Sequence, residues 1–385
     1  MKNTIRILAA TFLAIAVSGC AEKEAAPVPD PIPATTARMT PELIEELDTV
    51  IDSLAQAHNL PGVAIGIWIP GEEDYLRTFG VANLETGEPR EFDDQFRIAS
   101  VTKTFTATVL LTLVDEELVS TSDPLSLYLP DFPGGDGITI RNLLRMRSGL
   151  VDYAGAGLLS DWYSNPFKYY PMDSLIAVIA SNSADFTEPG VQTVYCNANY
   201  TLLAKIAETV TGQSFGELLE ERVFHPLGMT STVFPDPDDH LLAGSNRSYS
   251  WDLTEESFVD MTELNTSCAN AGGAIVSCMS DLEVYARALY QGTLLNPETQ
   301  QHRLETEVFE GAPEFMQYGE GIVRFGEFWG HNGTIFGFST EMYYLPQENA
   351  VMVVNVNRLD LDDASQSSGI FGIVSRMVFP EYVSW

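Results

Sequence analysis

The stretch Phe96–Phe105 most constrains the fold, because it opens a helix that has to be buried. Apolar residues follow at helical spacing: Phe105, Val109, Leu110, Leu113 and Val114. The spacing predicts a helix that runs to about Val119 and is covered by other elements. Ser100 and Lys103 lie three residues apart at its start, so their side chains share one face. This setting suits a serine nucleophile beside a base, and it equally suits a helix start followed by a solvated lysine.

Segments on both sides of this helix predict a sheet flanked by helices. Thr40-Pro41 opens a helix with an apolar stripe that reaches about His58. Two strands, residues 63–69 and 75–81, are joined by a turn at 70–73. Later segments complete the pattern: strands at 318–325, 335–345 and 350–355, then an amphipathic segment at 365–378. The order predicts an α+β fold built on an antiparallel β-sheet.

The middle of the chain has a different character, with helical segments joined by connections rich in Gly, Pro and Asp. The predicted helices cover residues 139–146, 173–180, 199–210 and 214–222. We interpret 123–267 as a mainly helical region inserted into an α/β sheet domain formed by 40–122 and 268–385.

The N-terminus has the pattern of a targeting segment. Lys2 and Arg6 precede an apolar run at 7–17 that ends in Ser18-Gly19-Cys20. The end of this run resembles the lipobox of bacterial lipoproteins, which implies that 1–19 is a signal peptide and that Cys20 is lipidated. An ordinary secretory signal with an incidental cysteine is the alternative. Residues 20–39 then predict a tether, and the chain is expected to be exported and lipid-anchored to the cell-envelope membrane, with its catalytic body in the periplasm.

The charge of the chain excludes one class of partner. With 54 acidic and 20 basic residues the net charge is −34. Such a surface repels the phosphate backbone, so we exclude a nucleic-acid function. A small-molecule or peptide substrate is the expected partner.

Two later motifs carry groups suited to acyl transfer. Tyr195-Cys196-Asn197 offers a phenol and an amide in a loop before a helix, although surface polarity would produce the same residues. His331-Asn332-Gly333 lies on or beside a predicted strand, where glycine permits the close approach of a ligand or backbone. A lone histidine in a glycine turn is more often structural.

Taken together, the three motifs resemble the serine β-lactamase-like hydrolases, which include class C β-lactamases, D-alanyl-D-alanine carboxypeptidases and related esterases. Ser100-x-x-Lys103, Tyr195-x-Asn197 and His331-x-Gly333 occur in the order and approximate spacing of that family. The resemblance covers roughly residues 42–357. Flanking segments extend it: Phe96–Ser100, Leu143-Leu144, Ser148–Leu150, Pro226–Met229, Ala271–Gly273, Ser277, Asp281-Leu282 and Gly337-Phe338.

The resemblance implies a role for each motif residue. Ser100 would form an acyl-enzyme, Lys103 would take the serine proton, and Tyr195 would relay protons to the leaving group. Asn197 would orient the substrate amide, and the backbone N–H groups of Ser100 and Thr334 would form the oxyanion hole. No metal or cofactor is required.

Departures from the family pattern leave the substrate open. Class C β-lactamases have Lys-Thr-Gly where this chain has His331-Asn332-Gly333. By the resemblance, His331, Asn332 and Gly333 are substrate-binding candidates. Asn332 replaces the threonine that often contacts a substrate carboxylate in the carboxypeptidases. D-Ala-D-Ala peptides are the first expectation, β-lactams the second and small esters the third. A non-catalytic envelope-binding lipoprotein is the alternative of another class.

The remaining cysteines give two expectations. Cys268 and Cys278 are candidates for a disulfide in an oxidising periplasm. Cys196, inside the Tyr-x-Asn motif, is expected to serve as small packing volume.

Overall fold

The computed structural model describes residues 38–156, 158–235, 246–252, 256–359 and 366–385. At its centre is an eight-stranded sheet in the order β2-β1-β12-β11-β10-β9-β8-β7, with every neighbouring pair antiparallel. The strands are β1 (Gly62–Trp68), β2 (Tyr75–Gly80), β7 (Glu307–Val308), β8 (Met316–Tyr318), β9 (Val323–Phe325), β10 (Phe328–Ile335), β11 (Phe338–Leu345) and β12 (Ala350–Val356). The antiparallel sheet confirms the α+β prediction. The expected signal peptide and Cys20 lie outside the described residues.

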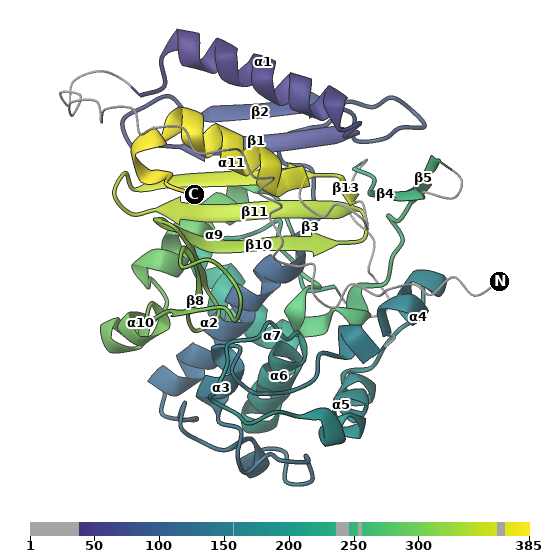
Figure 1. Cartoon of the computed structure of the whole chain (residues 1–385), viewed down its shortest axis with the longest axis vertical. Helices are drawn as coiled ribbons and strands as arrows, with labels where there is room; N and C mark the ends of the chain where they lie inside the picture. The colour runs from purple at the N-terminus through teal and green to yellow at the C-terminus, as the bar shows by residue number, and fades with distance from the viewer. Residues whose placement is uncertain (1–37, 157, 236–245, 253–255, 360–365) are drawn as a thin grey trace.

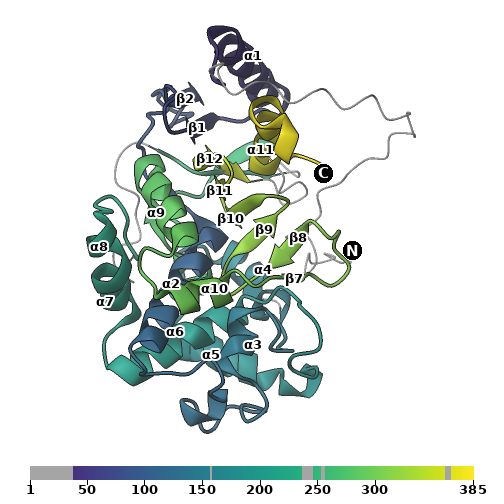
Figure 2. The same cartoon turned by 90° about the vertical axis from the view of Figure 1, so that its left-hand side faces the viewer.

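Helices cover both faces of this sheet. Helices α1 (Pro41–Ala57) and α11 (Gln366–Val378) lie on one face and α9 (Met279–Gln291) on the other (Figures 1 and 2). Thr40 caps α1 as expected, because its hydroxyl accepts a hydrogen bond from Leu43 N at 3.2 Å. Every residue of β12 is buried, since the strand is covered from both sides.

Helix α2 (Thr102–Asp115) joins the sheet to the helical part of the molecule (Figure 2). It packs on α6 (Ala198–Thr211), and its Phe105 ring stacks on Tyr285 of α9 at 3.6 Å between centroids. Burial of each such ring contributes roughly 2–3 kcal/mol. The other helices are α3 (Ile140–Leu144), α4 (Leu158–Ser164), α5 (Met172–Ser181), α7 (Phe215–Leu219), α8 (His225–Leu227) and α10 (Pro297–Arg303).

Several element boundaries differ from the prediction, and backbone geometry explains them. The strand predicted at 318–325 is two strands, β8 and β9, separated by a turn with Gly321 at φ +73°. The strand predicted at 335–345 begins only at Phe338, because the chain reverses after β10 with Gly337 at φ +86°. Helix α2 stops short of Val119, since Glu117 has φ +58°.

Two small sheets were not predicted. Strands β4 (Tyr249–Asp252) and β5 (Ser257–Asp260) lie inside the 123–267 segment and join β13 (Arg358–Leu359). Strand β3 (Phe96–Arg97), just before the nucleophile candidate, pairs with β6 (Val276–Ser277). No helix in the described part of the chain has the length and apolar composition to cross a bilayer.

Candidate active site

A strand-turn-helix segment holds Ser100. Strand β3 leads into a 3₁₀ turn, Ala99–Val101, and α2 begins at the next residue. Ala99 has φ +50°, a left-handed conformation that costs an L-residue roughly 1 kcal/mol. A strained turn of this kind persists only when the surrounding structure holds it in place. Ser100 itself is buried, with 6% of its surface exposed.

Lys103 lies against Ser100, as the three-residue spacing predicted. Its Nζ is 3.0 Å from Ser100 Oγ and 2.7 Å from the Gly272 carbonyl oxygen. Burial lowers the pKa of Lys103 to about 7, and the nearby charge of Asp152 opposes that shift. At slightly alkaline pH the amine is therefore largely neutral and able to accept the serine proton.

Tyr195 completes a three-residue group. Its hydroxyl is hydrogen-bonded to the Ser100 side chain, and its ring centroid lies 4.9 Å from Lys103 Nζ. Burial raises the pKa of Tyr195 well above its usual value, so the side chain stays a phenol. A hydroxyl, an amine and a phenol thus meet in one buried place.

His331 lies on β10 beside this group and is uncharged. Burial, with the charge of Lys103 as a second cause, lowers the pKa of His331 to about 3. Its Nδ1 is 2.5 Å from the Asn332 carbonyl oxygen, which only accepts, so Nδ1 carries the proton. Nε2 is then an acceptor, 3.5 Å from Tyr318 Oη. With its Nδ1–H directed to the Asn332 carbonyl oxygen, the neutral ring has an acceptor and no second donor to offer.

Gly333 brings β10 against the nucleophile. A Cβ at Gly333 would lie 2.8 Å from Ser100 N and closer still to the Ile98 carbonyl oxygen, which leaves no room for a side chain. The next residue, Thr334, therefore also lies near the Ser100 turn. Strand alternation sends the Asn332 side chain to the opposite face from His331, where Asn332 lies across from Glu341.

Asn197 is the N-cap residue of α6, and it is held by Asp152, a residue that the sequence analysis did not single out. Asn197 Nδ2 donates to Asp152 Oδ2 at 2.7 Å, and Asn197 N donates to the same oxygen at 3.2 Å. Ala154 N donates to Asp152 Oδ1 at 3.1 Å. The one signal in the sequence that could have pointed to Asp152 is its position two residues after the flanking segment Ser148–Leu150.

The predicted pairing of Cys268 with Cys278 is wrong. Both are buried free thiols. Cys268 ends a 3₁₀ turn, Thr266–Cys268, whereas Cys278 lies between β6 and α9 as the N-cap residue of that helix. Cys196 is buried and its backbone N–H donates to Met146 Sδ at 3.3 Å. Burial raises the pKa of Cys196 well above its usual value, which makes its thiol a poor nucleophile.

Within the described ranges, no group of three or more His, Cys, Asp or Glu side chains is placed to hold a metal ion. The chemistry that the arrangement offers is nucleophilic attack by a buried serine with an amine base and a phenol at hand. A model of the family described as Beta-lactamase matches residues 47–370. The chain belongs to this family.

Individual relatives agree with this assignment. The chain is 28% identical over 316 residues to penicillin-binding protein 4* of Bacillus subtilis, covering 77% of this chain and 68% of the relative. It is 26% identical to the D-alanyl-D-alanine-carboxypeptidase/endopeptidase AmpH of Escherichia coli, covering 88% and 90%. A match to the D-aminopeptidase of Brucella anthropi is 31% identical but spans 50% of this chain and only 36% of that enzyme.

A solved structure matches most of the chain. The D-stereospecific amidohydrolase from a Streptomyces species superposes with a TM-score of 0.76 at 28% identity, covering 88% of this chain and 99% of that one. The protein is thus a hydrolase of the serine β-lactamase-like family, with an antiparallel sheet flanked by helices.

Proposed function

We propose that this hydrolase cleaves an amide or peptide bond on the carbonyl side of a D-amino acid through an acyl-enzyme on Ser100. The observation that carries the proposal is the 3.0 Å approach of Lys103 Nζ to Ser100 Oγ, with the pKa of Lys103 lowered to about 7. A base with that pKa works near neutral pH.

The reaction divides into two steps. Lys103 takes the proton of Ser100, whose Oγ attacks the substrate carbonyl and forms a tetrahedral oxyanion held by the backbone N–H groups of Ser100 and Thr334. The C–N bond breaks as the proton held by Lys103 reaches the leaving amine through the Tyr195 hydroxyl, and an ester on Ser100 remains. Water then attacks the ester while its proton passes through the Tyr195 hydroxyl to Lys103, and that proton returns to Ser100 Oγ as the acid leaves. Asn197 holds the substrate beside the scissile bond.

The names of the relatives support substrates with D-amino acids. D-Ala-D-Ala peptides are the substrates that the sequence favours first; a carboxypeptidase activity would cleave the bond between the two D-alanines and release the C-terminal one. D-amino acid amides are the second candidate, because the uncharged His331 provides no cation for a free C-terminal carboxylate. β-Lactams and small esters fit the same nucleophile and complete the set to be tested.

A steady-state comparison of these four substrate classes tests the proposal, with Ser100→Ala as the matched variant. We expect the wild type to turn over at least one D-configured amide or peptide and Ser100→Ala to turn over none. Equal turnover by both proteins contradicts the nucleophile assignment. No turnover on any substrate, together with saturable binding of muropeptides, supports the envelope-binding alternative instead.

We also propose that the chain is exported and anchored through lipid on Cys20, on the strength of the lipobox-like segment before it. Metabolic labelling with a radioactive fatty acid is expected to mark the wild type and not Cys20→Ser. Equal labelling, or none in the wild type, contradicts the anchor.

A further inference from the structure

Met146, just after α3, holds the loop of Tyr195 on both sides of the tyrosine. Its backbone oxygen accepts a hydrogen bond from Val194 N at 2.8 Å, and its Sδ accepts one from Cys196 N at 3.3 Å. Val194 and Cys196 are the two neighbours of Tyr195 in the chain. A single residue therefore fixes the backbone just before and just after the proposed proton relay.

A second donor reaches the same sulfur from the first turn of α6. Asn199 Nδ2 lies 3.5 Å from Met146 Sδ. Ser148 Oγ accepts from Leu150 N at 3.2 Å, so its own hydrogen is free for Asn199 Oδ1 at 2.6 Å. This bond turns the Asn199 amide nitrogen toward the sulfur, which only accepts. The sulfur thus joins the loop of Tyr195 to the helix that follows it.

Backbone conformation does not favour a methionine at position 146. Met146 has φ +57°, a left-handed conformation that residues with a bulky side chain rarely adopt. Met146 is 1% exposed and Cys196 2%, so solvent has little access to the sulfur or to the N–H group that it binds. A buried N–H group without an acceptor is costly, and the sulfur is the acceptor provided here. The side chain therefore supplies an acceptor as well as packing volume.

We propose that Met146 is a positioning residue of the reaction, whose sulfur keeps the Tyr195 hydroxyl in place through the Cys196 N–H group. The inference rests on the acyl-enzyme function above, in which a proton reaches the leaving amine through Tyr195. That hydroxyl is hydrogen-bonded to the Ser100 side chain, and the tyrosine ring lies 4.9 Å from Lys103 Nζ. Loss of the sulfur lets the loop move and lengthens this relay, and proton transfer slows steeply with such shifts.

Met146→Leu tests the proposal, because it removes the sulfur and keeps most of the apolar volume. The substrates are N-acetyl-D-alanine p-nitroanilide and the p-nitrophenyl ester of the same acid. The anilide needs a proton on its leaving nitrogen, whereas p-nitrophenolate leaves without one, so acylation by the anilide alone depends on Tyr195. We expect kcat/KM of Met146→Leu to fall about 10- to 30-fold on the anilide and less than about threefold on the ester. The ratio of the two values does not depend on how much of a preparation is folded.

Met146→Gln is the rescue variant, since its side chain is unbranched, of similar length and carries an acceptor oxygen. It should recover at least about a third of the wild-type anilide-to-ester ratio, although a buried amide makes it less stable in denaturant than Met146→Leu. Met352→Leu is the matched control, because Met352 is equally buried, at 1%, within β12. It should keep the wild-type ratio.

Two results overturn the positioning role alone. One is a wild-type ratio in Met146→Leu, and the other is a ratio that follows stability, lower in Met146→Gln than in Met146→Leu. Labelling of wild-type Ser100 by a fluorophosphonate shows in either case that the acyl-enzyme function stands. Failure of that labelling overturns the function and the positioning role together.

Discussion

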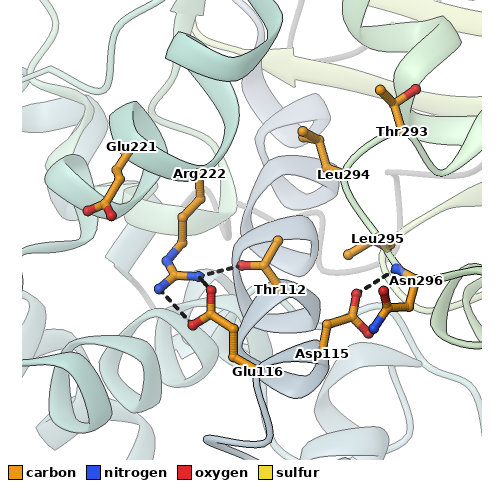
Figure 3. A pocket seen from close by; sticks show the side chains of 9 residues that line it. All are labelled: Thr112, Asp115, Glu116, Glu221, Arg222, Thr293, Leu294, Leu295 and Asn296. Carbon is orange, nitrogen blue, oxygen red and sulfur yellow. Dashed lines mark hydrogen bonds and ion pairs between the residues drawn. The ribbon is translucent and has the colours of Figure 1, made fainter.

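Helix α2 carries polar groups at both ends, and the two ends are built differently. At the N-terminal end Lys103 is fully buried and touches Ser100. At the C-terminal end a cleft of about 580 Å³ opens between α2, the segment around Arg222 and the loop before α10 (Figure 3). Nine residues line it: Thr112, Asp115, Glu116, Glu221, Arg222, Thr293, Leu294, Leu295 and Asn296.

Two charged side chains of the cleft, Arg222 and Glu116, are paired with each other, and Asp115 is held by hydrogen bonds from neutral groups. Arg222 binds Glu116 through two hydrogen bonds, at 2.7 and 3.1 Å, and Asp115 accepts from Asn296 N at 2.7 Å (Figure 3). The Glu116 side chain is 49% exposed, so solvent screens the pair. Chemistry on α2 is therefore expected at the end where groups are buried and their pKa values shifted, and not at the open cleft.

The largest expected effect on activity is at the N-terminal end of α2. Lys103→Ala removes the base and should lower kcat/KM by at least about 10³-fold. Lys205→Ala, on α6, removes a lysine that is paired with Asp173 and should change kcat/KM less than about twofold. Kinetics with matched far-UV circular dichroism checks both. Retained turnover in a folded Lys103→Ala would remove the distinction between the ends.

Gly333→Ala should lower kcat/KM by about 100-fold, because the added methyl group pushes β10 away from Ser100 N. Gly369→Ala in α11 is the control, since a Cβ there meets nothing within 4 Å. It should leave kinetics unchanged and raise stability by up to about 1 kcal/mol. Full activity in Gly333→Ala would contradict the close packing at the nucleophile.

Glu341 lies outside the catalytic group and tests whether burial alone shifts the pKa of a side chain. Burial raises the pKa of Glu341 to about 7, against hydrogen bonds from Ser367 and Ser368. The unfolded carboxyl ionises near its usual pH of about 4.5, so wild-type stability should fall as pH rises from there to about 7. Glu341→Gln should then be more stable than wild type by about 3 kcal/mol at pH 8, with the difference vanishing toward pH 4.5.

Denaturant unfolding at several pH values measures this difference, with the exposed Glu298→Gln as the control that should match wild type throughout. A pH-independent difference for Glu341→Gln would show that its carboxyl is not held neutral.

The pH profile of the wild type should carry the mark of Lys103. Because the base has to be neutral, kcat/KM should fall about tenfold for each pH unit below about 7. His331, with its pKa lowered to about 3, should add no second limb in that range. A profile that stays flat down to pH 5 would exclude Lys103 as the base.

The smallest effect is expected in the cleft. Arg222→Ala breaks the pair with Glu116 and should cost no more than about 1 kcal/mol in unfolding free energy. Activity should stay within about twofold of wild type. A larger loss of kcat/KM with unchanged stability would show that the two ends of α2 are coupled.

Local patterns in the sequence predicted what depends on neighbours along the chain. The Thr40 cap, the hairpin of β1 and β2, and the shared face of Ser100 and Lys103 all follow from spacing within one element. Helix α9 was missed although Leu282, Tyr285 and Leu289 recur at helical spacing and are buried.

Contacts between distant segments were beyond the reach of such patterns. Asp152 and Asn197 are 45 residues apart, and their pairing depends on how a loop folds onto the start of α6. The approach of Gly333 to Ser100 depends on the register of β10 in the sheet. The orientation of the His331 proton follows from a carbonyl position that spacing does not give.

The most direct test of the central claim is the intact mass of the protein after reaction with a fluorophosphonate. The wild type should gain one adduct, mapped to the peptide that contains Ser100, and Ser100→Ala should gain none. Lys103→Ala should react far more slowly, because its serine keeps its proton. Equal adducts on wild type and Ser100→Ala would contradict the assignment of Ser100 as the nucleophile.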